Sequence, residues 1–154
     1  MNTISRGNAA EAAVLHALIK ADLVVLMPFG GGAPFDLAVV LPPDGEIARI
    51  QVKSGRVRKG CVTFNACNTD HGRGRISYRG LAEFIAVDVL ELGRQFIVPV
   101  DDCPSFQGLL RLEAPRNNQR AGVRFADDRD LADWLRSLAE ICEPEAVSSA
   151  SVSS

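Results

Sequence analysis

The stretch FDLAVVLPPDGEIARIQVK (residues 35–53) predicts a β-hairpin, and the rest of the fold is inferred outward from it. Two runs rich in apolar and β-branched residues, 35–41 and 46–53, have the composition of strands. The connecting PPDG at 42–45 is strong turn chemistry, because proline and glycine supply the backbone angles that tight turns need. The sequence therefore predicts two antiparallel strands joined by a short turn.

A hairpin centred on PPDG pairs residues whose numbers sum to 87, so that Asp36 lies opposite Gln51. Directly opposed residues point to the same face of a sheet, with Cβ atoms about 4.5–5.5 Å apart. Lys53 shares that face with Gln51, because side chains alternate along a strand. The hairpin thus predicts a carboxylate, an amide and an ammonium group in one cluster. A register slip of one residue would separate them.

The segments on either side of the hairpin predict one mixed α/β domain. Two helices are expected, one from an N-cap at Gly7-Asn8 to about Lys20 and one over 127–141 with Asp127 or Asp128 as its cap. Further strands are expected at 22–28, 61–65, 83–89 and 94–100, and a polar loop at 66–77. The length of 154 residues fits a single domain, placed at 1–142, before a disordered Ser- and Ala-rich tail at 143–154.

The composition excludes several classes of protein. Hydrophobic residues make up 47% and charged residues 23%, which is typical of a globular domain and rules out wholesale disorder. Apolar runs reach only about five residues, whereas a membrane-spanning helix needs about 20, so we expect no membrane association and a cytoplasmic location. The four cysteines lack C-x-x-C spacing and predict free thiols. Cys61, Cys67 and His71 match no common zinc pattern.

Positive charge is concentrated in the middle of a chain whose net charge is −2. Between residues 49 and 80 the only acidic residue is Asp70. The basic residues of this segment are Arg49, Lys53, Arg56, Arg58, Lys59, Arg73, Arg75 and Arg79. Such a segment can meet phosphate groups without making the whole chain bind polyanions.

Glu11 lies beside the apolar stripe of the first helix, where a carboxylate needs a partner or a metal ion. A helix packed on the hairpin would aim Glu11 toward Asp36 and Lys53. Two carboxylates and backbone carbonyls are hard oxygen ligands, which suit Mg²⁺ or Mn²⁺. A nearby lysine can orient or activate a water molecule and stabilise charge on a phosphoryl oxygen. Together with the adjoining cations, this set indicates phosphodiester hydrolysis.

The order of Glu11, then PFD (34–36), then QVK (51–53) resembles the PD-(D/E)XK nuclease superfamily. Gln51 occupies the superfamily's last acidic position, and this Q-x-K variant is similar to the group I intron-encoded homing endonucleases. The likeness spans most of residues 6–135. It continues through SYRGLAEF (77–84), FIVPV (96–100) and LRLEAPRNNQ (110–119).

The resemblance implies a restriction-endonuclease-like core, an α/β fold with a mixed β-sheet flanked by helices. It implies that Asp36 is the metal-binding carboxylate and that Glu11 is the helix acid that binds or supports the metal. It further implies that Lys53 is the catalytic lysine, that Gln51 fills the variant position, and that the carbonyl of Val52 joins the metal shell. Glutamine lacks charge, so one anion fewer holds the metal. Mg²⁺ is the expected cofactor, with Mn²⁺ as the second candidate.

The expected partner is double-stranded DNA. We expect a homo-oligomer, at least a dimer, because a duplex has two strands and each active site cuts one; pseudopalindromic targets would follow. The Asn117-Asn118 pair is most simply a turn, but we count Asn117 among the DNA contacts. The candidate DNA-binding residues are Arg56, Arg58, Lys59, Arg73, Arg75, Arg79 and Asn117.

Two other interpretations stay open. Gln51 also suits a non-catalytic DNA-binding module that keeps the nuclease fold. The chain also fits a restriction, repair or phage-derived nuclease, which only the substrate or the genomic neighbourhood separates from a homing enzyme. Taken singly, Lys53 is an ordinary strand-end lysine and Glu11 a solvated helix residue; the joint pattern with Asp36 carries the argument.

Overall fold

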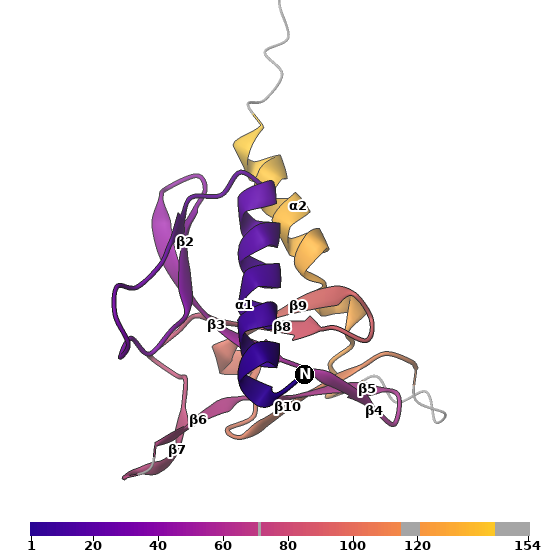
Figure 1. Ribbon diagram of the computed structural model, residues 1–154. Helices are drawn as coiled ribbons and strands as arrows, with labels where there is room; N and C mark the ends of the chain where they lie inside the picture. Colours follow the sequence, from indigo (N-terminus) through magenta and orange to yellow (C-terminus); the bar gives the residue numbers. More distant parts are fainter. Residues whose placement is uncertain (71, 115–120, 144–154) are drawn as a thin grey trace, which may run out of the picture.

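A five-stranded mixed sheet forms the centre of the computed structural model, which describes residues 1–70, 72–114 and 121–143 (Figure 1). Its strand order is β1–β2–β3–β8–β9, with only β3 and β8 running parallel. The strands are β1 (Val25–Leu26), β2 (Leu37–Leu41), β3 (Glu46–Ser54), β8 (Phe84–Val89) and β9 (Arg94–Pro99). The predicted α/β class with a mixed sheet is confirmed.

Two helices, α1 (Thr3–Lys20) and α2 (Leu131–Cys142), cover the same face of this sheet (Figure 1). Helix α1 crosses β3 and β8. It buries Ala10, Val14 and Leu18, which recur every four residues and so form one helical stripe. Helix α2 packs against β9 through Leu131. Neither helix is long and apolar enough to cross a membrane, within the part of the chain that the structure describes.

A smaller sheet covers the opposite face, in the order β10–β5–β4. Its strands are β4 (Arg56–Arg58), β5 (Cys61–Asn65) and β10 (Gln107–Arg111). Because both faces of the central sheet are covered, Ile85 to Val89 of β8 are all buried. The hairpin of β6 (Cys67–Asp70) and β7 (Gly74–Ser77) extends away from this sheet at the lower left of Figure 1. Short 3-10 turns cover Val100–Asp102 and Asp127–Arg129.

The hairpin of β2 and β3 has the predicted register. Leu37 pairs with Ile50 and Leu41 with Glu46. Since Ile50 and Val52 are buried against the helices, the alternate side chains on β3 point to the other face of the sheet. The register therefore positions Gln51 and Lys53 on one face, as expected, and that face is the one away from the helix-covered core.

Both predicted helix caps were wrong. The Asn2 side chain caps α1 by accepting a hydrogen bond from the Ser5 N–H at 2.8 Å, so Gly7-Asn8 lies inside the helix. The cap of α2 is Asp130, which accepts from the Ala132 N–H at 2.9 Å. Asp127 and Asp128 instead belong to the preceding 3-10 turn. In each case a competing polar residue lay close to the true cap.

The strand predictions failed where the chain is exposed on both sides. The strand expected at 22–28 is only the two-residue edge strand β1, and Val24 and Met27 are exposed. The loop expected at 66–77 is the β6–β7 hairpin, whose polar residues gave no alternating pattern. The strand expected at 94–100 ends at Pro99. Strands β4 and β10 are not predicted from the sequence. All four cysteines are free, as expected. Of the expected tail, residues 144–154 lie outside the described residues.

Candidate active site

Asp36 is held against β3 by hydrogen bonds from both its backbone and its side chain. It directly precedes β2, and its N–H donates to the Ile50 carbonyl at 3.1 Å. One carboxylate oxygen, Oδ2, accepts from the Val52 N–H at 2.8 Å and from the Gln51 side-chain amide. The structure therefore brings Asp36 and Gln51 together as the hairpin register predicted, and it fixes the direction of the carboxylate.

Glu11 reaches the same place from helix α1. Glu11 and Asp36 both line an open hollow of about 230 Å³, walled on the other side by Met27, Pro28 and the glycines at 30–32. Partial burial raises the pKa of the Glu11 carboxyl, and the nearby charge of Asp36 raises it further. Among the described residues, none forms an ion pair with Glu11. Two carboxylates therefore line one hollow, close enough for the charge of Asp36 to act on Glu11.

Lys53 is half-buried, and its ammonium Nζ lies 5.0 Å from the centre of the Tyr78 ring. Burial lowers the pKa of Lys53, while the charges of Asp36 and Cys67 act in the opposite direction. Tyr78 itself is 3% exposed, and burial, with the same two neighbours, raises the pKa of its hydroxyl to about 12. Tyr78 is thus a neutral aromatic wall beside the amine of Lys53.

The oxygen donors of this site suit a hard divalent cation. Asp36 and Glu11 supply carboxylates, and Asp36 uses only Oδ2 for its side-chain hydrogen bonds with Gln51 and Val52. The N–H and C=O of one strand residue point to the same side, so the Val52 carbonyl is directed to the edge where Asp36 lies. No cluster of three or more His, Cys, Asp and Glu side chains occurs within the described ranges, and the side chain beside Asp36 is the neutral amide of Gln51.

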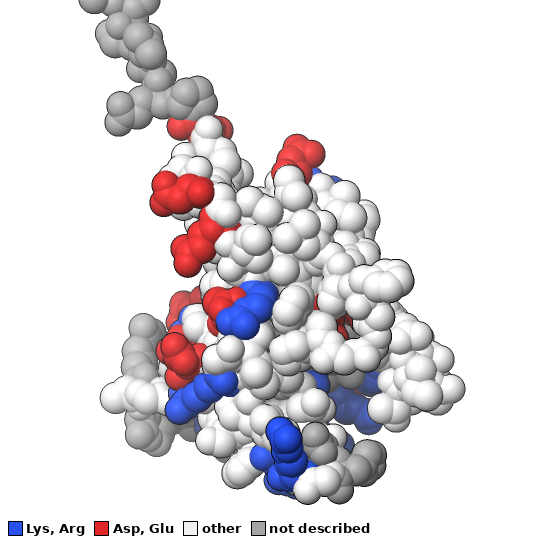
Figure 2. Space-filling model, turned by 90° about the vertical axis from the view of Figure 1, so that its left-hand side faces the viewer, with Lys and Arg blue, Asp and Glu red and all other residues white. Residues whose placement is uncertain are grey.

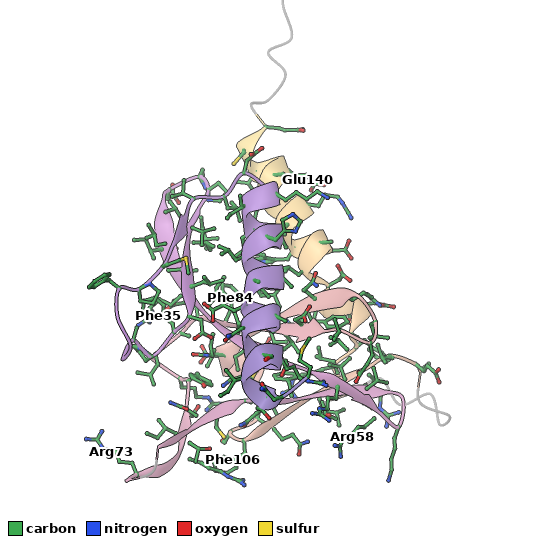
Figure 3. All side chains as sticks on the ribbon, in the orientation of Figure 1. Phe35, Arg58, Arg73, Phe84, Phe106 and Glu140 are labelled. Atoms are coloured by element: carbon green, nitrogen blue, oxygen red, sulfur yellow. The ribbon has the colours of Figure 1, made fainter. Side chains whose placement is uncertain are left out.

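The guanidinium groups of Arg56, Arg58 and Arg75 line a second depression, a groove of about 500 Å³. It begins at Ser54, the last residue of the strand that carries Lys53. Arg75 is stacked over the Phe106 ring, with 5.5 Å between the guanidinium carbon and the ring centre. In Figure 3 the labelled Arg58 and Phe106 lie along the lower edge of the molecule. Figure 2 shows the side of the molecule that lies at the left in Figure 1. On that side most Lys and Arg side chains lie in the lower part, and most Asp and Glu side chains lie above them.

The other predicted DNA-binding residues lie outside this groove. Lys59 is exposed at the β4–β5 turn, and Arg73 lies at the tip of the β6–β7 hairpin (Figure 3). Arg79 donates a long hydrogen bond of 3.5 Å to the Cys103 carbonyl. Asn117 lies outside the described residues. Arg49, counted in the basic segment, is bound by Glu83 at 2.5 Å and so is not available to a phosphate.

Sequence reasoning missed the contributions of distant segments. Tyr78 belongs to the SYRGLAEF segment at 77–84, and its contact with Lys53 arises only from tertiary packing. Phe106 and Gln107 join the basic groove through β10, a strand with no clear apolar pattern. No sequence signal could have found Gln107, because QGLLR at 107–111 has no alternation of polar and apolar residues. The alternation appears only in the structure, where Gly108 and Leu110 are buried and Gln107 and Leu109 are exposed.

Known proteins resemble this chain in fold and in sequence. The chain resembles the bacterial homing endonuclease I-Ssp6803I in structure, with a TM-score of 0.67 and 23% sequence identity over 91% of this chain and 95% of the other. At this identity the likeness concerns the fold. No curated protein matches the sequence. The sequence model of the PD-(D/E)XK endonucleases matches residues 1–131, and that segment contains Glu11, Asp36, Gln51 and Lys53. This chain belongs to the PD-(D/E)XK endonuclease family.

Proposed function

We propose that this chain is a Mg²⁺-dependent endonuclease of homing type that cuts both strands of double-stranded DNA at a specific site. The observation that carries the proposal is the position of Asp36. Its carboxylate is oriented by Gln51 and Val52, and it shares a hollow with Glu11. A basic groove begins one residue after Lys53.

Asp36, Glu11 and the carbonyl of Val52 would hold the metal ion, with Mn²⁺ as the second candidate. When bound, Mg²⁺ supplies Lewis-acid polarisation of a phosphoryl oxygen. Gln51 contributes a neutral amide that keeps Asp36 directed into the site. Because Gln51 carries no charge, we expect weaker metal binding here than in a site with three acids.

Lys53 is the proposed catalytic lysine. Its half-buried ammonium can orient the attacking water molecule and offset negative charge on the phosphoryl oxygen. Burial makes this electrostatic contribution stronger than it would be in bulk water. The ring of Tyr78 restricts the positions open to the amine. Glu11, Asp36, Gln51 and Lys53 are therefore the residues on which we expect cleavage to depend.

The DNA duplex is proposed to bind along the basic groove, with Arg56, Arg58 and Arg75 as its central contacts. Lys59, Arg73, Arg79 and Asn117 are proposed as further contacts. One active site cuts one strand, so double-strand cleavage requires at least a homodimer, and two-fold symmetry favours pseudopalindromic targets. We further propose that the protein acts on DNA in the cytoplasm and has no membrane partner.

A cleavage assay tests the proposal. Purified protein is incubated with Mg²⁺ and a diverse DNA library, and the cut ends are sequenced. We expect defined cuts that disappear in Asp36→Ala and Lys53→Ala and persist in Lys20→Ala, a matched change at the exposed end of α1. The absence of cuts with wild-type protein in both Mg²⁺ and Mn²⁺ would overturn it.

The uncharged Gln51 also supports a second candidate, a DNA-binding module without catalysis. That candidate predicts tight DNA binding, no cleavage, and binding unchanged by Asp36→Ala. A restriction, repair or phage-derived role differs only in the DNA it acts on. The recognised sequence, together with an intron around the encoding gene, separates those roles from homing.

A further inference from the structure

The outer face of the β10–β5–β4 sheet carries an ordered set of polar side chains. Alternation along β5 and β10 sends Val62, Phe64 and Leu110 into the core. Their neighbours, with two arginines of β4, point outward and form what we call the outer sheet face. It consists of Arg56, Arg58, Thr63, Asn65, Gln107 and Leu109.

The strand register arranges these side chains in rows. Arg56 lies opposite Thr63, and Thr63 lies opposite Leu109. Asn65 lies opposite Gln107 in the adjoining row. Directly paired residues share a face with Cβ atoms about 4.5–5.5 Å apart. The face therefore presents closely spaced groups of different chemistry.

This face is hollowed and electropositive. All of its members except Leu109 line the 500 Å³ groove together with Arg75, and none of the groove's lining residues is acidic. Arg56 and Arg58 are exposed and have no ion-pair partner among the described residues. Arg49, Arg94, Arg129 and Arg136 are by contrast paired with carboxylates. Two arginines without an ion pair among the described residues are thus neighbours on this face.

The chemistry of the outer sheet face exceeds what phosphate binding needs. Phosphates require cations, but here amides, a hydroxyl and an apolar side chain lie among the arginines. The side chain of Gln107 makes no hydrogen bond within the described residues, so its donor and acceptor are both available. The oxygen of Asn65 accepts from the Cys67 N–H at 3.3 Å, which leaves its NH₂ group as a donor. Arginine pairs with guanine, glutamine with adenine, and apolar groups contact the thymine methyl in the major groove.

We propose that the outer sheet face enters the DNA major groove and reads base edges, with Arg56 and Gln107 as specificity-determining residues. The inference rests on the proposed function in taking duplex DNA as the ligand. It goes further by separating residues that read sequence from residues that hold phosphate. β-ribbons and β-sheets are among the elements that proteins use to read DNA grooves.

The position of the bases that are read follows from the chain. Arg56 lies three residues after Lys53, so their Cα atoms are at most about 11 Å apart. The rise of DNA is about 3.4 Å per base pair. The short chain separation therefore places the base pairs read by Arg56 close to the phosphate that Lys53 approaches.

Selection of bound sequences tests this inference without cleavage. Protein is mixed with a randomised duplex library in the absence of divalent metal, and bound DNA is sequenced. We compare wild type with Gln107→Ala and with Arg56→Lys, which keeps the charge but lacks the forked guanidinium. The control is Arg136→Lys on the exposed surface of α2. Melting temperatures establish that each variant is folded.

Wild-type protein is expected to enrich a defined sequence motif. Each outer-face variant should lose the preference at one or two base pairs by about tenfold to a hundredfold, while affinity for random DNA changes little. Arg136→Lys should enrich the wild-type motif. A wild-type protein that enriches no motif, or outer-face variants that enrich the same motif undiminished, would overturn the inference. Motif selection without any cleavage in Mg²⁺ would instead leave it standing and overturn the proposed function.

Discussion

The side-chain amide of Gln51 donates a hydrogen bond to Asp36 at the point where an acid would repel that carboxylate. The same Asp36 oxygen also accepts from the Val52 N–H at 2.8 Å. In the absence of metal, the neutral amide stabilises the site because it pairs a half-buried carboxylate. The consequence is that a bound cation meets one negative charge fewer.

Gln51→Glu should therefore destabilise the metal-free protein and strengthen metal binding. Without metal, the substitution removes a donor and adds a like charge, which we expect to lower the free energy of unfolding by about 1–3 kcal/mol. With millimolar Mg²⁺, part or all of this loss should be recovered, because a ligand that binds only the folded state stabilises it. Urea denaturation in EDTA and in Mg²⁺ measures both effects.

Gln95→Glu is the matched control for this substitution. Gln95 donates to the Asp88 carboxylate at 2.8 Å and is half-buried in the same sheet, outside the residues that line the hollow. It should lose stability in EDTA and recover none of it in Mg²⁺. Equal recovery in both variants would contradict a metal site at Asp36, and so would no recovery in Gln51→Glu.

Tyr78 should act on cleavage through its ring. The Lys53 ammonium lies 5.0 Å from the ring centre, a contact worth about 0.5–2 kcal/mol. Tyr78→Leu should therefore lower the rate of cleavage at saturating DNA by about 2- to 30-fold. Tyr78→Phe keeps the ring and should retain most of the rate. Single-turnover cleavage of a fixed duplex provides the measurement.

Phe96→Leu separates this effect from a general loss of packing. Phe96 is fully buried and its ring lies 5.0 Å from the Arg94 guanidinium, on the strand at the far edge of the sheet. The variant should lose stability as Tyr78→Leu does, with an unchanged cleavage rate. If the two leucine variants slow cleavage equally, Tyr78 has no specific relation to Lys53.

The fold was most predictable where local and tertiary preferences agree. PPDG at 42–45 and the alternating strands on either side set both the hairpin and its register before any tertiary contact is known. The β6–β7 hairpin gave no such signal, because exposed strands need no apolar alternation. The short edge strand β1 was overpredicted since its exposed apolar residues resemble core residues in sequence.

The residues of the candidate site also differ in how well the sequence predicts their positions. Asp36, Gln51 and Lys53 lie on one hairpin, so their proximity follows from strand periodicity alone. Tyr78 approaches Lys53 from a segment 25 residues farther along the chain. No spacing rule predicts that contact, which depends on how the β6–β7 hairpin returns to β8. Tertiary packing, and not local propensity, completes the wall beside the catalytic lysine.

Gly108 should be intolerant of any side chain. A Cβ atom at this position would lie 2.0 Å from the ring of Phe64, its partner on β5, so the ring packs directly on the glycine backbone. Gly108→Ala should therefore lower the free energy of unfolding by about 1–3 kcal/mol through overpacking. Gly7→Ala, in the open on helix α1, should raise it by about 0.5–1 kcal/mol. Urea denaturation that gives both variants the same sign would contradict this packing.

The Arg49–Glu83 pair should make stability depend on pH with a definite sign. The Glu83 carboxylate accepts from the Arg49 guanidinium at 2.5 Å and from its backbone N–H at 2.6 Å, which joins the segment before β8 to β3. The side-chain hydrogen bond from Arg49 is the main cause that lowers the pKa of Glu83 below its ordinary value of 4.5. Both side chains are more than a third exposed, so solvent screening keeps the contribution of the pair small.

A carboxyl whose pKa is lower in the folded state stabilises the protein above its unfolded pKa, and the contribution is lost as the pH falls through the folded value. Glu83→Gln should thus be less stable than wild type at pH 7, and the difference should shrink from about pH 4.5 downward as wild-type Glu83 takes up its proton. Glu46→Gln, at the exposed start of β3, should show no such difference. Urea denaturation from pH 3 to 7 measures the difference in the free energy of unfolding between wild type and Glu83→Gln. A difference that grows on acidification would mean that Glu83 is not stabilised as a carboxylate. Arg49 would then be free to join the DNA-binding surface.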